Sequence, residues 1–141
     1  MPRTPPLDVR APIGWPLMPV PDANGALRWP GLAHSVADAL RKLLATQPGE
    51  LLGHPSYGAG LQGFLHEPNT LATRSRIREA VERAVGRFEP RVVLEAVTVS
   101  DDTAPLQDVG SLRIELVYRL KRDGQRAGLA VRVGTLASPG G

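Results

Sequence analysis

The sequence predicts an α+β domain in which two main helices pack on a small, mainly antiparallel sheet, preceded by a proline-rich arm. Prolines crowd residues 1–30. Apolar side chains then recur at helical spacing in two stretches, and after residue 91 they follow the period of two that is typical of strands. We expect residues 1–30 to form the arm, residues 31–136 to form a single domain with one core, and residues 137–141 to be a frayed tail.

The arm holds eight of the fourteen prolines of the chain, a density that excludes both helix and interior strand. We expect it to be extended, with one short hairpin at Asn24-Gly25, because Asn-Gly is the favoured pair for a tight turn. Trp15 and Trp29 would hold the arm in place. Residues 1–12 are expected to be a disordered leader.

The first helix is expected over residues 35–47, where apolar residues follow helical spacing and charged ones fall mostly on the opposite face. The apolar positions are Val36, Leu40, Leu43 and Leu44. Ser35, with Asp38 three residues later, resembles a capping box at the start of this helix. Pro48 ends the helix because proline disfavours helical geometry at the preceding residue, and Gly49 then allows a sharp exit.

Short apolar pieces alternate with glycines in residues 51–69, which predicts a series of tight turns. A phosphate-binding loop is not expected, because no Lys-Ser or Lys-Thr pair follows these glycines. His54 and His66 are too far apart in sequence for the paired histidines of one metal-binding helix, and we expect them to be ordinary loop residues. No metal or cofactor site is predicted.

The second helix is the clearest helical pattern in the chain, with Thr70 as a plausible N-cap. Its apolar stripe is Ile77, Ala80, Val81, Ala84, Val85 and Phe88. Its outer face carries several arginines and glutamates, including Glu79 and Arg83 at a spacing that allows a weak ion pair, and is expected to be solvated. Pro90 should end the helix at Phe88 or Glu89.

Three strands are expected after this helix. Residues 92–99 are β-branched and mostly apolar, as in a strand buried on both faces. Residues 112–120 and 129–133 alternate, as in strands with one face on the core. Asp123-Gly124 lies between the last two strands and predicts the turn of a hairpin. Residues 100–111, which include Asp101, Asp102 and Asp108, are expected to be a solvent loop.

Composition narrows the function classes. The chain has no cysteine, so disulfides and thiolate metal sites are excluded, and a reducing interior suits it. We expect synthesis in the bacterial cytoplasm without a signal peptide or membrane span. Seventeen basic and fourteen acidic residues leave a net charge of +3, spread along the chain with few aromatic residues, so no nucleic-acid partner is expected.

Four short motifs occur in order between the first helix and the first strand. They are Pro48-Gly49-Glu50; Tyr57-Gly58 with Gly60-Leu61; Phe64 with Glu67-Pro68-Asn69; and Phe88 with Glu89-Pro90-Arg91. In this order and on this helix-loop-helix-strand frame they closely resemble the sheath-initiator, or baseplate wedge, proteins of contractile phage tails, tailocins and related injection systems. The resemblance covers about residues 13–133 and departs at the C-terminus, where many relatives end in an apolar, aromatic strand.

The resemblance implies a structural role without catalytic residues, in a virion or tail-like particle. Family members are similar in fold to the core of a tail-sheath subunit, lie as six copies around the tail axis near the tube end, and template the first sheath ring. The resemblance implies docking on a wedge protein through Glu89, Pro90 and Arg91. An open sheet edge can also accept a partner strand, and we expect Leu129, Val131 and Val133 to pair with the sheath protein.

Alternatives remain open at this point. One alternative is that Glu89 and Arg91 bond only within the chain, to each other or to loop amides, instead of to a partner. A peptidoglycan-degrading, lysozyme-like activity would need two carboxylates flanking a cleft, for which Glu50, Glu67 and Glu89 are candidates only by being acidic. The chain would then be an enzyme. Two further hypotheses are that the chain is the equivalent subunit of a type VI secretion baseplate, or a free-standing adaptor outside any tail.

Overall fold

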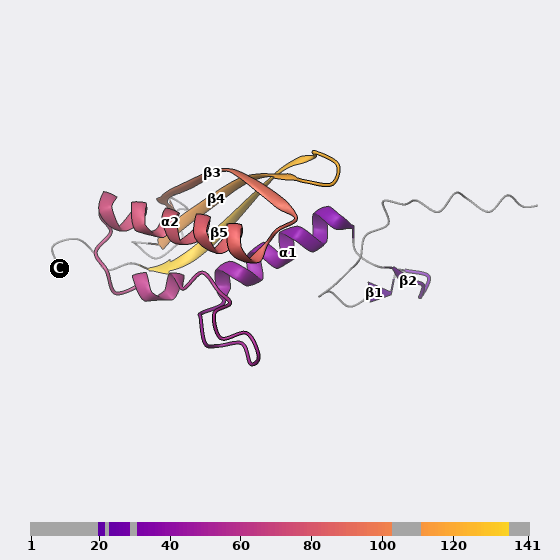
Figure 1. Ribbon diagram of the computed structural model, residues 1–141, viewed down its shortest axis with the longest axis horizontal. Coiled ribbons are helices and arrows are strands. Elements are labelled where there is room, and N and C mark those ends of the chain that lie inside the picture. The colour runs from indigo at the N-terminus through magenta and orange to yellow at the C-terminus, as the bar shows by residue number, and fades with distance from the viewer. Residues whose placement is uncertain (1–19, 22, 29–30, 103–110, 136–141) are drawn as a thin grey trace, which may run out of the picture.

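The computed structural model of the protein describes residues 20–21, 23–28, 31–102 and 111–135 (Figure 1). The elements are β1 (Val20–Pro21), β2 (Leu27–Arg28), α1 (Leu32–Ala45), η1 (Leu61–Phe64), α2 (Leu71–Phe88), β3 (Val92–Asp101), β4 (Ser111–Leu120) and β5 (Arg126–Thr135). Trp15, Trp29, Asp108, the expected leader and the expected frayed tail lie outside the described residues. The helices and strands confirm the predicted α+β class.

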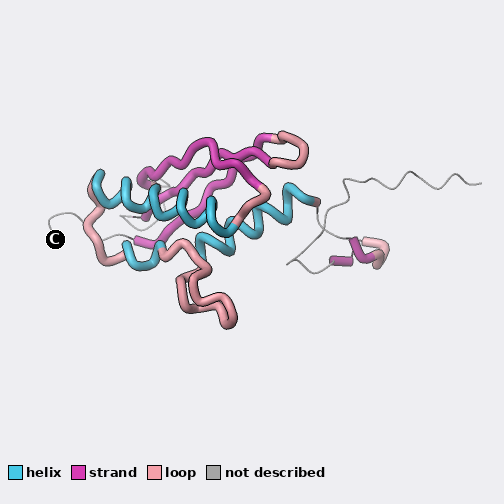
Figure 2. Tube along the Cα trace, in the orientation of Figure 1, coloured by secondary structure: helices cyan, strands magenta, loops and turns pink. Residues whose placement is uncertain are grey.

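The domain has two layers (Figures 1 and 2). One layer is an antiparallel sheet with the strand order β3-β4-β5. The helices α1 and α2 form the other layer, with η1 beside them in the connection between the two helices. A separate two-stranded ladder pairs β1 with β2, and Gly25 in its turn has φ of +77°, as expected for the Asn24-Gly25 hairpin.

The core lies between the helices and the central strand. Every second residue of β4 is at most 1% exposed: Leu112, Ile114, Leu116, Tyr118 and Leu120. These side chains meet the apolar stripes of the helices, whose fully buried members include Val36, Leu40, Ile77 and Val81. The intervening residues of β4 are exposed or half-buried. The alternation predicted for this strand is confirmed, because only one face of the sheet is covered by helices.

The two helix starts differ from each other in how well they were predicted. Thr70 is the N-cap of α2, since its Oγ1 accepts the Thr73 amide at 3.2 Å. The helix α1 and its apolar positions were predicted correctly, but its start was not: it begins at Leu32 with Gly31 as N-cap, and Ser35 is a buried residue of its first turn. The apolar face of α1 continues one turn earlier than assumed, and Ser35 turns to a tertiary contact instead of a cap.

The prediction that residues 92–99 are buried on both faces was also wrong. β3 is an edge strand, with helices on one face only, and Val93 is 50% exposed. Its pairing with β4 shifts by one residue between Leu94 and Ala96, which leaves Glu95 as the extra residue of a β-bulge. The strand also continues to Asp101, into the expected loop. Its apolar composition reflects β-propensity more than burial.

The hairpin between β4 and β5 was predicted correctly, but its connection is shorter than expected and spans residues 121–125. Gly124 has φ of +71° and its amide donates to the Leu120 carbonyl at 2.9 Å. The Leu120 amide in turn donates to the Gln125 carbonyl at 2.8 Å. β5 then runs from Arg126, three residues earlier than the alternation of residues 129–133 indicated.

Candidate functional site

The first motif closes the turn that follows α1. Glu50 accepts the Gln47 amide on its Oε2 at 2.9 Å and donates its own amide to the Gln47 carbonyl at 3.1 Å. Gly49, between them, has φ of +91°, a conformation that favours glycine. The Glu50 carboxylate is therefore part of a backbone turn.

The second motif brings the returning chain against the end of α1. The Ala59 amide donates to the Leu43 carbonyl at 3.1 Å, and Gly58 is buried with φ of +128°. A Cβ atom on Gly58 would lie 2.3 Å from the Thr46 carbonyl oxygen. Glycine is required here because two backbone segments touch.

The aromatic and apolar residues of this motif face the core. Leu61 is 2% exposed. The Tyr57 ring packs edge-on against the Phe88 ring, with centroids 5.2 Å apart. Burial raises the pKa of the Tyr57 phenol, and the charge of nearby Glu89 raises it further. Tyr57 thus connects the loop to the end of α2.

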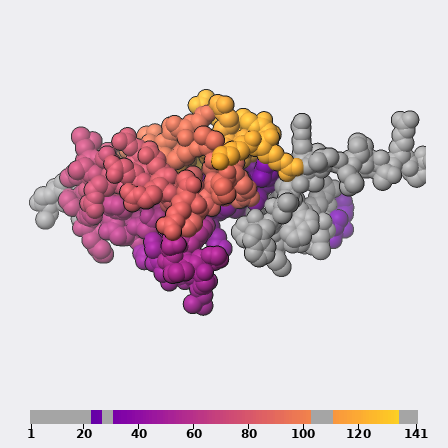
Figure 3. Space-filling view, viewed as in Figure 1, coloured from indigo at the N-terminus to yellow at the C-terminus, as the bar shows by residue number. Residues whose placement is uncertain are grey.

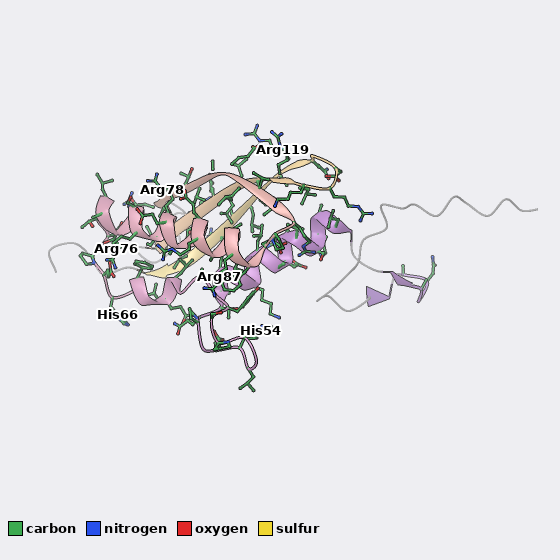
Figure 4. All side chains as sticks on the ribbon, viewed as in Figure 1. His54, His66, Arg76, Arg78, Arg87 and Arg119 are labelled. Atoms are coloured by element: carbon green, nitrogen blue, oxygen red, sulfur yellow. The ribbon has the colours of Figure 1, made fainter. Side chains whose placement is uncertain are left out.

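Between these two motifs the chain forms a projection, residues 49–56, visible at the bottom of Figure 3. Leu52 in this projection is 98% exposed. Figure 4 shows His54 here and His66 beyond η1, at separate places on the surface. In the part of the chain that the structure describes, no three histidine, aspartate or glutamate side chains gather closely enough to hold a metal ion.

The third motif ties the start of α2 to the end of β3. The Asn69 side-chain amide donates to Asp101 Oδ1 at 2.8 Å. Arg74 donates from Nε to Asn69 Oδ1 and from Nη2 to Asp101 Oδ1, each at 2.8 Å. The Asn69 hydrogen bond, which is the largest effect, lowers the pKa of Asp101, burial opposes it, and the hydrogen bond and charge of Arg74 lower the pKa further.

A neighbouring contact holds η1 against α2. Glu67 Oε2 lies 2.6 Å from Arg76 Nη1, and the same guanidinium lies over the Phe64 ring, 5.3 Å from its centroid. Figure 4 shows Arg76 near the start of α2. The Glu67 carboxylate is therefore paired within the domain.

The fourth motif forms a forked ion pair. Arg91 donates from Nε to Glu89 Oε1 at 2.7 Å and from Nη2 to Glu89 Oε2 at 2.8 Å. Its backbone amide also reaches Glu89 Oε1, at 3.3 Å. The side chain of Glu89 is 6% exposed and that of Arg91 is 31% exposed. Hydrogen bonding to Glu89 raises the pKa of Arg91 despite partial burial.

This ion pair also reaches α1. Arg91 Nη1 donates to the Ser35 hydroxyl at 3.2 Å, which explains why a serine is buried in the first turn of that helix. The Glu89 side chain is enclosed, whereas the Arg91 side chain is partly exposed and lines a hollow on the surface. Of the expected docking residues, Arg91 is thus the charged group that a partner can reach.

The outer face of the sheet carries ion pairs that were not predicted from the sequence. Glu95, the bulged residue of β3, lies 2.7 Å from Arg119 Nη2 on β4 and 2.6 Å from Arg126 Nε on β5. One carboxylate thus links all three strands. Its neighbours in the sheet are far apart in sequence, and only the strand order and the bulge bring them together.

A comparison with protein families decides the identity. The family described as baseplate wedge protein gp25 matches residues 31–125. The chain belongs to this family. It is accordingly a structural baseplate component of a contractile system, in agreement with the resemblance carried by the four motifs. A search of curated proteins gave no match.

Solved structures agree with the family. A candidate tail lysozyme from Geobacter sulfurreducens has a TM-score of 0.70 and 26% identity, over 81% of this chain and 100% of that one. A chain of the anti-feeding prophage baseplate has a TM-score of 0.60 and 28% identity, over 76% and 85%. A chain of the type VI secretion baseplate complex shares the fold, with a TM-score of 0.56 and 19% identity over 75% and 95%.

The carboxylates of this gp25-family chain are placed as structural groups. Glu50 accepts a backbone amide, Glu67 pairs with Arg76, and Glu89 pairs with Arg91. They belong to three separate turns, and each has its partner within the domain. Neither helix of the described part combines the length and apolarity that a bilayer crossing requires.

The close approach at Gly58 can be tested in the gp25-family domain by Gly58→Ala. We expect a loss of about 3 kcal/mol in the free energy of unfolding, because the methyl group meets the Thr46 carbonyl and the backbone is strained. Gly86→Ala, in α2 with open space around it, should instead stabilise by about 0.5 to 1 kcal/mol. Urea unfolding followed by circular dichroism measures both, and equal effects would contradict the assignment.

Removing the cation from the forked pair, as Arg91→Gln, should cost about 3 kcal/mol of stability because it leaves a buried carboxylate unpaired. Glu89→Gln combined with Arg91→Gln should recover much of that loss, since no buried charge remains. Arg83→Gln on the exposed face of α2 should change stability by less than about 0.5 kcal/mol. A double variant as unstable as Arg91→Gln would show that the charge pair is not the cause.

The lowered pKa of Asp101 predicts a pH-dependent contribution to stability. The ionised group favours folding above its unfolded pKa of about 3.9, and this contribution is lost as the pH falls through the lower folded pKa. Asp101→Asn should therefore cost less than about 1 kcal/mol at pH 7, because Asp101 is 53% exposed, and the gap should narrow towards pH 3. If the stability difference between wild type and Asp101→Asn stayed constant from pH 7 to pH 3, the effect would come from the shape of the side chain instead of its charge.

Proposed function

We propose that this chain docks on the wedge proteins of a contractile-tail baseplate and starts the sheath by accepting a sheath strand on the edge of β5. The observation that carries the proposal is that β5 lies at an edge of the described sheet and has a regular register, in a domain of the baseplate wedge family. An edge strand presents unpaired main-chain groups to which an extended segment of another protein can add.

The hairpin sets which main-chain groups of β5 are available. Leu120 donates to the Gln125 carbonyl, so residues 120 and 125 form a hydrogen-bonded pair. Such pairs alternate with non-bonded pairs along an antiparallel ladder. In the observed register the odd-numbered residues of β5 therefore turn their main-chain groups towards β4, and the even-numbered Gly128, Ala130 and Arg132 turn theirs outward.

The side chains of β5 suit a strand that continues the core. Leu129 is 6% exposed, and Val131 and Val133 pack against the core in part. They line the covered face of the sheet, next to which an apolar residue of an added strand would lie. Ala130 and Arg132 are exposed, and β5 contains no proline. The register is regular from Arg126 to Val133.

The opposite edge of the sheet is less suitable. β3 carries the bulge at Glu95, and a bulge twists an edge and interrupts its ladder. Glu95 is also engaged by two arginines from the neighbouring strands. Of the two edges, β5 is therefore the one that we assign to the sheath.

The rest of the proposal follows family membership. Six copies would surround the tail axis near the tube end, with the wedge reached through the exposed edge of Arg91 and with Glu89 and Pro90 positioning it. Particles of this kind include the anti-feeding prophage baseplate that contains a similar chain. The type VI secretion baseplate shares the fold and is the alternative setting.

Ala130→Pro tests the strand pairing. It removes an outward main-chain donor at a position where an edge strand tolerates proline, so the protein should fold and enter baseplates while sheath fails to polymerise. Electron microscopy of purified particles should show tubes with baseplates and no sheath. Ala130→Thr retains the donor and should give sheathed tails.

The neighbouring position provides the internal control. Val131→Pro removes a donor that is directed at β4, and should lower the stability of the isolated protein. Fully sheathed tails carrying a folded, incorporated Ala130→Pro protein would show that another surface starts the sheath. Absence of the wild-type protein from purified tails would overturn the baseplate role altogether.

A further inference from the structure

A surface hollow of about 380 Å³ lies beside the forked ion pair. It is lined by Leu32, Arg91, Lys121 and Arg122, which come from the start of α1, the start of β3 and the turn after β4. Three of these four residues are cations. The fourth, Leu32, is a half-buried residue that packs against the core and adds an apolar wall.

The walls of the hollow are held together by main-chain bonds. The Lys121 amide donates to the Arg91 carbonyl at 2.9 Å, so the turn after β4 is joined to the start of β3. The turn is closed by the Gly124 amide on the Leu120 carbonyl at 2.9 Å. Asp123 Oδ1 also accepts the Gln125 amide, at 2.9 Å. The cations are therefore carried on a fixed frame.

Among the described residues that line the hollow, all the charged side chains are positive. Glu89 balances one cation, Arg91, and Lys121 forms no ion pair with any residue in the described part of the chain. Arg122 adds a further positive charge. Among the described residues no acidic side chain lines the hollow. The site thus favours a carboxylate, and its apolar wall favours an aliphatic group next to that carboxylate.

We propose that this hollow receives an acidic segment of a wedge protein, with a carboxylate at Lys121, Arg122 and the exposed edge of Arg91 and an aliphatic side chain against Leu32. The inference rests on the proposed function and deepens it. It extends the docking surface from the Glu89-Pro90-Arg91 motif to a turn about thirty residues later in the chain, which the motif alone does not indicate.

The test is the double variant Lys121→Glu with Arg122→Glu, expressed in cells that produce the tail particles. Copies of the protein per purified particle are counted by quantitative mass spectrometry. We expect at least about a tenfold loss relative to wild type, because two attractive contacts become repulsive. The matched control, Arg78→Glu with Arg83→Glu on the exposed face of α2, changes the net charge equally and should be incorporated normally.

Each failure has a separate meaning. Wild-type protein absent from particles would overturn the proposed function. Wild-type and Lys121→Glu/Arg122→Glu protein present in equal amounts would overturn this inference alone. An equal loss of the control variant would also overturn it, since net charge and not the hollow would then be responsible.

Two other occupants of the hollow, a second copy of the protein and the chain's own arm, are tested on the purified protein. We expect the Lys121→Glu/Arg122→Glu protein to match wild type in its urea unfolding midpoint and its sedimentation coefficient. A wild-type dimer that dissociates in the variant would place a second copy in the hollow. A lowered midpoint, matched by a chain lacking residues 1–28, would place the chain's own arm there. Either outcome would overturn the proposal.

Discussion

The ion pair between Glu89 and Arg91 is the contact on which the arrangement of the domain depends. Pro90 lies between the two residues, so one short segment ends α2, starts β3 and supplies both charges. Arg91 then reaches the Ser35 hydroxyl on α1, and its carbonyl accepts the amide of Lys121 after β4. Four elements are joined at this point. Because Glu89 is enclosed, its charge is tolerable only while the guanidinium remains in place.

The remaining motifs act in a similar way on the connections between elements. Gly58 allows two backbone segments to touch, and Asn69 joins the start of α2 to the end of β3 through Arg74 and Asp101. These residues shape the frame, and their polar groups are satisfied inside it. The surfaces that we propose for partners are the edge of β5 and the hollow beside Arg91. The motifs hold these surfaces in position, but most residues of the surfaces lie outside the motifs.

The structural role of the motif residues also bears on the lysozyme name of one structural relative. A general acid needs a carboxyl group that is poised to release a proton near a substrate. In this chain the glutamates of the motifs accept backbone amides or pair with arginines within the domain. The glutamates of the motifs thus stabilise turns within the domain. Their arrangement favours a scaffold within a baseplate.

The sequence by itself determined the fold class, the end of α1 and both ends of α2. It also determined the alternation of β4 and the hairpin before β5. Each of these features depends on local spacing or on one proline, glycine or cap. The sequence also carried the family, through four motifs in order. The burial of β3, the bulge at Glu95 and the role of Ser35 were decided only by the tertiary structure. Strand order determines which strand lies at an edge, and a residue such as Ser35 acquires its partner from a segment more than fifty positions away. Such long-range pairing leaves no periodic signal in the local sequence.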